Sequence, residues 1–144
     1  MRIDAASPDD LDAVRTLVAS SGLPLDGLGA HQPTLVLVAR QGGRLVGTAA
    51  LEGHGPDGLL RSVAVDPAAR GQGVGSALTA AALADAGRQG MRAVYLLTDT
   101  VPGFFTRHGF DRTGRDGAPD GIAASVEWSE ACGESAIAMV LALA

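Results

Sequence analysis

A glycine-rich run is the part of the sequence best suited to chemistry. It reads Arg70-Gly71-Gln72-Gly73-Val74-Gly75-Ser76, after an apolar stretch and before one rich in Ala and Leu. Glycines at the start of a helix let backbone N–H groups approach phosphate oxygens, and the helix dipole adds partial positive charge. The run therefore predicts a phosphate-binding loop, the alternative being a tight strand-to-helix turn that binds nothing.

Three kinds of phosphate-binding loop compete for this run. A dinucleotide-binding loop needs G-x-G-x-x-G, whereas the glycines here follow G-x-G-x-G. A triphosphate-binding P-loop needs a lysine, and all eleven basic residues are arginines. The third pattern is R-x-x-G-x-G, which resembles the pyrophosphate loop of coenzyme A-dependent acetyltransferases. Arg70, Gly73 and Gly75 match it.

Composition and charge narrow the function classes. The chain has 144 residues, of which 47% are hydrophobic and 19% charged, as is typical of one globular domain, here residues 1–144. Eleven basic and sixteen acidic residues give a net charge of −5. This balance argues against nucleic acid as a partner, because phosphate binding needs a basic face.

Cysteine, histidine and hydropathy narrow them further. Cys132 is the sole cysteine, and His31, His54 and His108 are scattered, so we expect no metal site. No apolar run approaches the roughly 18 residues that span a membrane, and the N-terminus has no signal-peptide pattern. These features predict a cytoplasmic protein without a membrane partner.

The hydrophobic residues alternate between strand and helix spacing. Strands are predicted over residues 1–5, 35–39, 44–52, 59–65, 93–97, 110–113 and 136–143, and helices over 7–22, from the glycine run to about 89, 101–108 and 121–131. Residues 41–43 predict a hairpin turn and residues 53–58 a longer break. This order favours a mixed α/β fold with helices on both faces of one sheet.

The residues around the loop resemble one family. The run from Leu59 to Leu78 resembles the central motif of the GCN5-related N-acetyltransferase (GNAT) superfamily, and Phe104 to Phe110 resembles its F-Y-x-x-x-G-F segment. The resemblance implies an α/β GNAT fold, a mixed and mostly antiparallel sheet that splays between the strands at 59–65 and 93–97. Acetyl-CoA would enter this gap as co-substrate, and the acceptor amine would arrive from the other side.

The same resemblance implies where acetyl-CoA binds. The backbone of Val63 and Val65 would pair with the pantetheine arm, and the Val63 N–H would hold the thioester carbonyl. The pyrophosphate would lie on the loop, whose residues are Arg70, Gly71, Gln72, Gly73, Val74, Gly75 and Ser76. The alternative for the Arg70 side chain is a solvated surface charge.

Glu52 is the candidate base. Period-two alternation places Thr48, Ala50, Glu52 and His54 on one face of their strand, beside the gap that the family implies. A carboxylate at this strand end could take the proton of the acceptor amine, directly or through water. The alternative is a solvent-facing acid at a strand end.

Arg61 is informative about the acceptor. An arginine within an apolar strand needs an anionic partner, because a buried unpaired charge is costly. A substrate carboxylate or phosphonate is one candidate partner. A salt bridge to Glu52, to Glu127 or to an aspartate is the other. The first alternative predicts a small, anionic, amine-bearing acceptor.

The sequence departs from the family at Phe105. Many GNAT members have a tyrosine at this position, whose hydroxyl can protonate the leaving thiolate. We expect Ser62, Thr98 or Cys132 to replace it, and we place Ser62, Thr98 and Phe105 with Arg61 in the substrate site. Trp128 and Phe104 are predicted to be core or dimer contacts, and a homodimer is left open.

Finer features resemble the arsenic-resistance N-acetyltransferase branch. They are residues 47–52, residues 59–62, and Cys132 to Ala136 with Met139. The branch implies an amine-bearing organoarsenical as acceptor, because a single thiol cannot bind trivalent arsenic well. The sequence therefore predicts direct acetyl transfer from acetyl-CoA to a small amine. The alternatives are an acyl-CoA-binding module with weak catalysis and an enzyme that acetylates protein or peptide N-termini.

Overall fold

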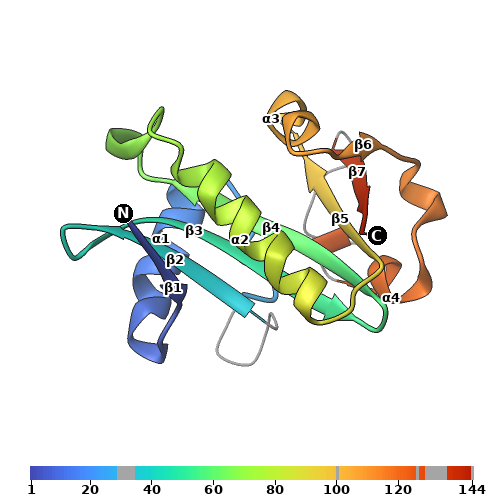
Figure 1. Cartoon of the computed structure of the whole chain (residues 1–144), viewed down its shortest axis with the longest axis horizontal. Helices are drawn as coiled ribbons and strands as arrows, with labels where there is room; N and C mark the ends of the chain where they lie inside the picture. The colour runs from blue at the N-terminus through green and yellow to red at the C-terminus, as the bar shows by residue number, and fades with distance from the viewer. Residues whose placement is uncertain (29–34, 100, 126, 129–135, 144) are drawn as a thin grey trace.

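One sheet of seven strands runs through the computed structural model, which describes residues 1–28, 35–99, 101–125, 127–128 and 136–143. The strand order is β1-β2-β3-β4-β5-β7-β6 (Figure 1). The strands are β1 (Arg2–Ala5), β2 (Leu35–Gln41), β3 (Arg44–His54), β4 (Asp57–Val65), β5 (Ala93–Thr98), β6 (Asp111–Arg112) and β7 (Ile137–Ala142). The helices are α1 (Leu11–Ser20), α2 (Val74–Arg88), α3 (Pro102–Arg107) and α4 (Asp120–Ala123), with short 3-10 turns at Pro8–Asp10, Pro67–Ala69 and Arg115–Gly117.

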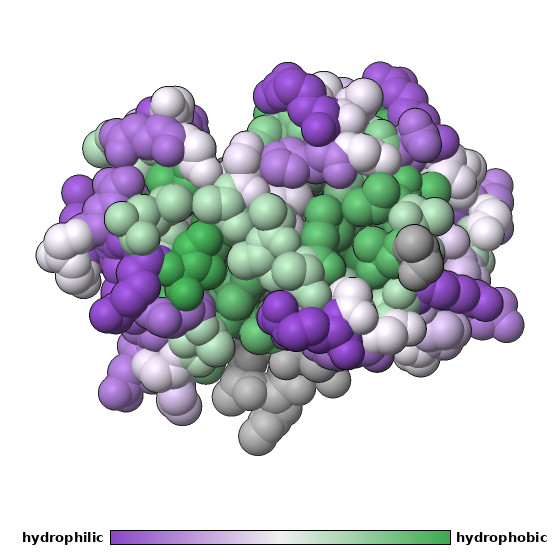
Figure 2. Space-filling model, viewed as in Figure 1, coloured by the Kyte–Doolittle hydropathy of each residue, from purple (hydrophilic) through white to green (hydrophobic). Residues whose placement is uncertain are grey.

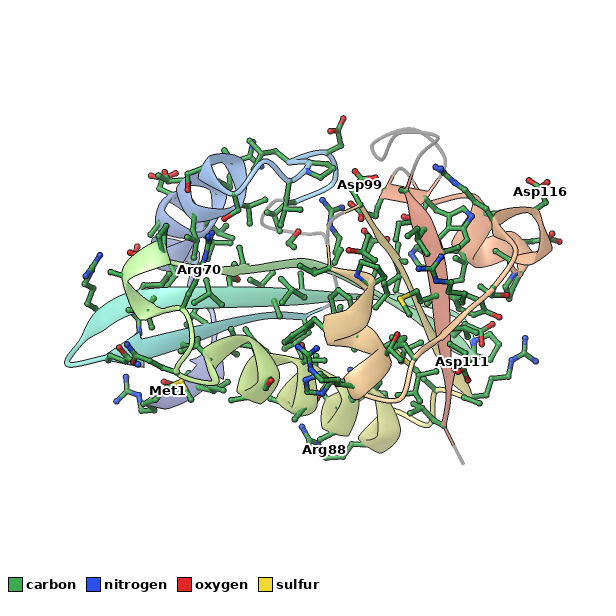
Figure 3. All side chains as sticks on the ribbon, turned by 90° about the horizontal axis from the view of Figure 1, so that it is seen from above. Met1, Arg70, Arg88, Asp99, Asp111 and Asp116 are labelled. Carbon is green, nitrogen blue, oxygen red and sulfur yellow. The ribbon has the colours of Figure 1, made fainter. Side chains whose placement is uncertain are left out.

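The helices cover both faces of the sheet, as the sequence predicted. Figure 3 shows α1 and α4 on one side of the strands and α2 and α3 on the other. The largest apolar cluster lies under α2 and α3, with Leu78, Leu51 and Phe105 among its members. A second cluster lies under α1, around Val14, Val18 and Val38. Figure 2 shows the α2 face as apolar in its middle and hydrophilic at its edges.

Two predicted segments differ from the structure. The break expected at residues 53–58 is a tight turn, since β3 continues to His54 and β4 starts at Asp57. Asp57 is buried at this turn, and its two carboxylate oxygens each accept a hydrogen bond from Arg92 at 3.1 Å. The helix expected over residues 121–131 ends at Ala123, and residues 129–131 lie outside the described residues.

The sheet splays between β4 and β5, as expected for the GNAT fold. These strands are parallel and pair only where residues 57–59 face residues 93–95. Every other neighbouring pair of strands is antiparallel. Beyond Leu59 the two strands separate, so backbone and side chains of both border a space between them.

A bulge in β4 lies beside the splay. Thr48 of β3 faces Ala64, but Ala50 faces Arg61, so Ser62 and Val63 together stand opposite Ala49. Ser62 has φ of +56°, the single positive value at a described residue other than glycine. A bulge turns the local backbone away from regular pairing and often re-aims groups beside a functional site. The bulge therefore changes the direction of the backbone where the gap opens.

Candidate active site

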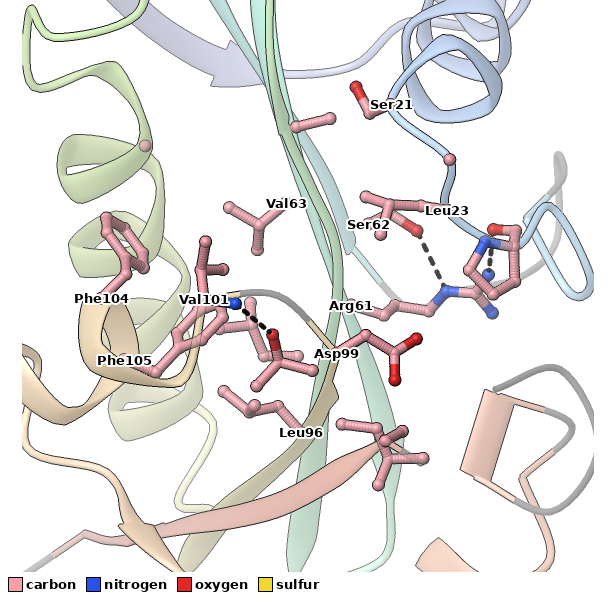
Figure 4. A pocket seen from close by; sticks show the side chains of 18 of the residues that line it. Ser21, Leu23, Arg61, Ser62, Val63, Leu96, Asp99, Val101, Phe104 and Phe105 are labelled. Carbon is pink, nitrogen blue, oxygen red and sulfur yellow. Dashed lines mark hydrogen bonds between the residues drawn. The ribbon is translucent and has the colours of Figure 1, made fainter. Parts of the chain in front are cut away.

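A cavity of about 830 Å³ occupies the splay and reaches both faces of the sheet. Figure 4 shows Val63, Phe104 and Phe105 on the side of α2 and α3, and Arg61, Ser62 and Asp99 on the side of α1. We call the first the cofactor side and the second the acceptor side. A single cavity that crosses the sheet allows two substrates to meet from opposite faces.

The glycine loop borders the cofactor side and opens α2. Gly71 and Gly73 have φ of +79° and +80°, and an added Cβ at either would meet nothing within 4 Å. The glycines are thus required by conformation, not by lack of space. Gly73 caps α2, a helix of 15 residues whose N-terminus carries partial positive charge. Such a loop is suited to bind a pyrophosphate through its backbone N–H groups.

The side chains of the loop point to several neighbours. The Val74 side chain is buried in the core, Gln41 donates a hydrogen bond to Gln72 at 3.0 Å, and Ser76 Oγ lies 3.2 Å from His108 Nε2. Only their backbone amides are therefore available for a phosphate. Gly75 is the loop glycine that lines the cavity, where an added Cβ would lie 3.5 Å from Phe104.

Arg70 bridges the loop and β4. Its side chain is exposed, and Nε donates to the Val65 carbonyl at 3.3 Å. Val63 and Val65 are both half-buried and both line the cavity. The structure therefore brings together the β4 backbone, Arg70 and the glycine loop, the three parts that the sequence assigned to acetyl-CoA.

Arg61 has the intramolecular partners that the sequence left as its alternative. Its side chain is fully buried, and Nη1 donates to Glu52 Oε2 at 3.0 Å. Nε donates to Ser62 Oγ at 3.1 Å and Nη2 to the Pro24 carbonyl at 3.2 Å. Nη2 also lies 3.6 Å from Glu127. This corrects the expectation of a substrate anion, because each guanidinium nitrogen already has a protein partner.

Glu52 is held from three sides and is not part of the cavity wall. Besides Arg61, both His54 Nε2 and Ser125 Oγ lie 2.7 Å from Oε1. Burial alone raises the pKa of Glu52, but hydrogen bonds from His54, Ser125 and Arg61 outweigh it and place the pKa below 4.5. A buried carboxylate that is already hydrogen-bonded is a weak base. This corrects the expected catalytic role, because the geometry makes Glu52 the anchor of Arg61.

The hydroxyl groups and Phe105 divide between the two sides. Phe105 is 6% exposed and packs edge-to-face on Phe104 and Phe110, so it is a core residue that also lines the cavity. Thr98, at the end of β5, lines the cavity and accepts a hydrogen bond from Val101 N at 3.4 Å. Trp128 is buried against Tyr95, in agreement with a core position. Cys132 lies outside the described residues.

The sequence reasoning missed two acidic residues of the acceptor side. Asp99 follows β5 directly, and Asp26 lies in the segment after α1; both are exposed and line the cavity. Glu127, considered only as a partner of Arg61, lines it as well. A polar residue directly after a strand that borders the gap was the one available signal for Asp99. Nothing local distinguishes Asp26 from an ordinary loop acid.

Two searches of the described residues bear on other site types. No group of three or more His, Cys, Asp or Glu side chains among them is arranged to hold a metal ion. No helix in the described part of the chain combines the length and apolar character required to cross a membrane.

Comparison with known families decides what this arrangement is. The family model described as "Acetyltransferase (GNAT) domain" matches residues 32–112, more than half of the chain. The chain belongs to the GNAT acetyltransferase family. The matched residues include β4, its bulge and the glycine loop, so the superfamily resemblance is confirmed.

A curated relative of this GNAT chain is mycothiol acetyltransferase of Rhodococcus opacus, 34% identical over 96 residues, or 60% of the chain. The chain spans about a third of that relative's length, 32%. Among solved structures, Rv2747 of Mycobacterium tuberculosis, bound to CoA and a second ligand, has a TM-score of 0.80 and 24% identity over the full length of both chains.

Two further structures show the same fold. N-acetylglutamate synthase of Neisseria gonorrhoeae has a TM-score of 0.81 at 20% identity, over 99% of this chain and 35% of that one. Ribosomal-protein-S18-alanine N-acetyltransferase of Escherichia coli has a TM-score of 0.71 at 19% identity, over 98% and 92%. These acetyltransferases have different acceptors, and assignment of this chain to the arsenic-resistance branch stays a prediction.

Proposed function

We propose that this GNAT chain transfers an acetyl group from acetyl-CoA directly to the primary amine of a small molecule. The observation that carries the proposal is a single cavity bordered on one side by the glycine loop and open on the other to a separate acceptor side. A tertiary arrangement of this kind positions a thioester and an amine for direct attack, which supplies much of the rate through orientation.

Acetyl-CoA is the first substrate, and this chain offers it mostly backbone. The amides of residues 71–76, at the positive end of α2, would bind the pyrophosphate, with Arg70 beside them. The Val63 N–H, in the bulge, would donate to the thioester oxygen and stabilise the negative charge that develops there. The amine nitrogen then bonds to the carbonyl carbon, the C–S bond breaks, and N-acetylated product and CoA thiolate separate.

Two protons move in this reaction. The acceptor amine must lose one to attack, and with Glu52 engaged by Arg61 the proposal assigns that proton to water. The CoA thiolate gains one, for which Thr98 is the buried hydroxyl of the cavity. A thiol with a pKa near 8.5 also leaves as the thiolate at moderate cost. Activity should therefore rise with pH toward the pKa of the amine.

An anionic acceptor, including an amine-bearing organoarsenical, has less support than before. The expectation depended on Arg61, whose nitrogens are occupied. The arsenic-resistance motif residues still support a detoxification substrate, and the test panel should include an arsenic amino acid. Acetylation of a protein N-terminus and acyl-CoA binding without turnover are the outcomes that would replace the proposal.

Cofactor binding is tested with two variants of one helix. Acetyl-CoA at a hundredfold excess over its Kd should stabilise the wild type by about 2.7 kcal/mol. Gly75→Leu places a side chain at the cavity wall near Phe104 and should abolish this stabilisation. Gly87→Ala, in α2 where an added Cβ meets nothing within 4 Å, should keep it. Release of free thiol is then measured against a panel of amines. If neither CoA nor acetyl-CoA stabilises the wild type, the proposal is wrong.

A further inference from the structure

The cations of the chain are few and accounted for. All eleven basic side chains are arginines, and each lies within the described residues. Arg61 and Arg70 are the two that line the cavity. Arg70 lies at the glycine loop, and the buried Arg61 guanidinium contacts Glu52, Ser62 and Pro24. The acceptor side therefore has no arginine beyond the one that Glu52 already compensates.

Carboxylates outnumber cations on the acceptor side. Asp26 and Asp99 reach the cavity from two different elements, and both are exposed. Glu127 is a third acid of the cavity lining, buried 3.6 Å from Arg61. Since Glu52 also faces Arg61, the acceptor side carries net negative charge. A substrate carboxylate placed there would be repelled.

The two ends of the cavity differ in helix polarity as well. The N-terminus of α2, with its partial positive charge, borders the cofactor side. Ser21 and Gly22, which follow the last residue of α1, line the acceptor side, so the partial negative charge of that helix end lies there. The same separation of charge places the anionic pyrophosphate at one end and favours a cation at the other.

From these observations we infer that the acceptor carries a second positive charge besides its reacting amine, as an aliphatic diamine or polyamine does; the inference rests on the proposed acetyl transfer. A carboxylate that binds the reacting ammonium raises its pKa and delays loss of the proton. Asp26 and Asp99 are more useful when they bind the far ammonium, because they then orient the molecule while the near amine stays free to deprotonate.

Three compounds with the same four-carbon chain test the inference. They are 1,4-diaminobutane, butylamine and 4-aminobutanoate, which differ at the far end as ammonium, methyl and carboxylate. In thiol-release assays, kcat/KM should be about tenfold higher for the diamine than for butylamine, and lowest for 4-aminobutanoate. Added salt should reduce the difference, because exposed charges are screened.

Variants identify the residues responsible. Asp99→Asn and Asp26→Asn should each lower the ratio of diamine to butylamine kcat/KM by about two- to fivefold. Asp116→Asn is the matched control, since Asp116 is exposed in the Arg115–Gly117 turn, far from Asp99 (Figure 3). The ratio should be unchanged in that variant.

The outcomes separate this inference from the proposed function. Equal rates for the three compounds, or a preference for 4-aminobutanoate, would overturn the diamine inference while acetyl transfer stands. If acetyl-CoA binds and none of the three is acetylated, the order is read from the thermal stability of the protein–CoA complex. Absence of extra stabilisation by the diamine in that measurement also overturns the inference. Failure of acetyl-CoA itself to bind overturns the proposed function.

Discussion

Arg61 and Glu52 form the centre of a buried ionic network behind the acceptor side. Glu52 accepts from Arg61 at 3.0 Å and has His54 and Ser125 at 2.7 Å, and each guanidinium nitrogen of Arg61 has a partner. A buried ion pair of this kind adds little net stability compared with apolar residues, but removal of one partner leaves an uncompensated charge. The network therefore sets the position of Arg61 at the cavity wall.

The first prediction is that Arg61 is structural before it is functional. Arg61→Met should lower the free energy of unfolding by about 3–5 kcal/mol, because Glu52 and Glu127 remain buried without their cation. The double variant with Glu52→Gln should recover part of this loss, since one uncompensated charge is gone. Urea unfolding at pH 7 measures both, and exposed Arg112→Met is the control, with a loss under about 0.5 kcal/mol. A raised KM for the acceptor with unchanged stability would contradict this assignment.

The second prediction concerns acid stability. The pKa of Glu52 is lower in the folded protein than its ordinary value of 4.5, so the unfolded chain binds a proton first as the pH falls. The stabilisation from this carboxylate is complete above about pH 5 and declines as the pH drops through the folded-state pKa. Glu52→Gln should flatten the curve of unfolding free energy against pH in this range. Asp10, whose pKa is lowered by its hydrogen bond from Arg40, should account for a remaining slope that Asp10→Asn removes.

At the level of elements, the bulge of β4 makes the sheet usable as a site. It sets Ser62 and Val63 apart from regular pairing with β3 beside the point where β4 leaves β5. Ser62 holds a left-handed conformation that glycine adopts freely and β-branched residues resist. The residue at this position therefore controls the backbone that is proposed to contact the thioester.

The third prediction follows from that conformation. Ser62→Gly should keep the bulge and most of kcat, with a small loss of stability from the missing hydrogen bond to Arg61 Nε. Ser62→Val should strain the backbone by about 1–3 kcal/mol and lower kcat, while stabilisation by acetyl-CoA through the loop persists. Steady-state rates and thermal shifts for both variants measure this. Equal kcat in the two would mean that the bulge has no part in the reaction.

For the whole molecule, the two halves of the sheet share few backbone pairs. Residues 57–59 and 93–95 are the paired residues between β4 and β5, and the cavity occupies the rest of their junction. A ligand that binds both strands would join the halves where hydrogen bonds between them are absent. Binding of acetyl-CoA should therefore be detectable in the backbone of both halves.

The fourth prediction uses hydrogen exchange for this purpose. Acetyl-CoA should slow amide exchange at residues 63–65 of β4 and 96–98 of β5, and at the loop of residues 71–76, because binding reduces local opening. The pairing of β1 with β2, at the far edge of the sheet, serves as the internal control and should exchange unchanged. Protection confined to the loop would show that the pantetheine arm does not enter the splay.

Local features of the sequence determined most of the fold and the cofactor side. Strand and helix periods follow from neighbouring residues, so the predicted elements agree with the structure except at residues 53–58 and 121–131. The glycine loop was equally accessible, because φ of +79° and +80° at Gly71 and Gly73 is a local demand that few other residues meet. The order of these elements then favoured one layered architecture and a family.

Only the tertiary structure decided the roles of the charged residues. Ser125 binds Glu52 across 73 positions of the sequence, and Pro24 binds Arg61 across 37, so no local pattern indicates either contact. The alternation that placed Glu52 on a strand face was right about direction and uninformative about partners. Asp26, Asp99 and Glu127 likewise come from three separate elements and meet because the sheet splays between them. A charge is assigned its role by what packs around it, and for these residues that environment is made by segments distant in sequence.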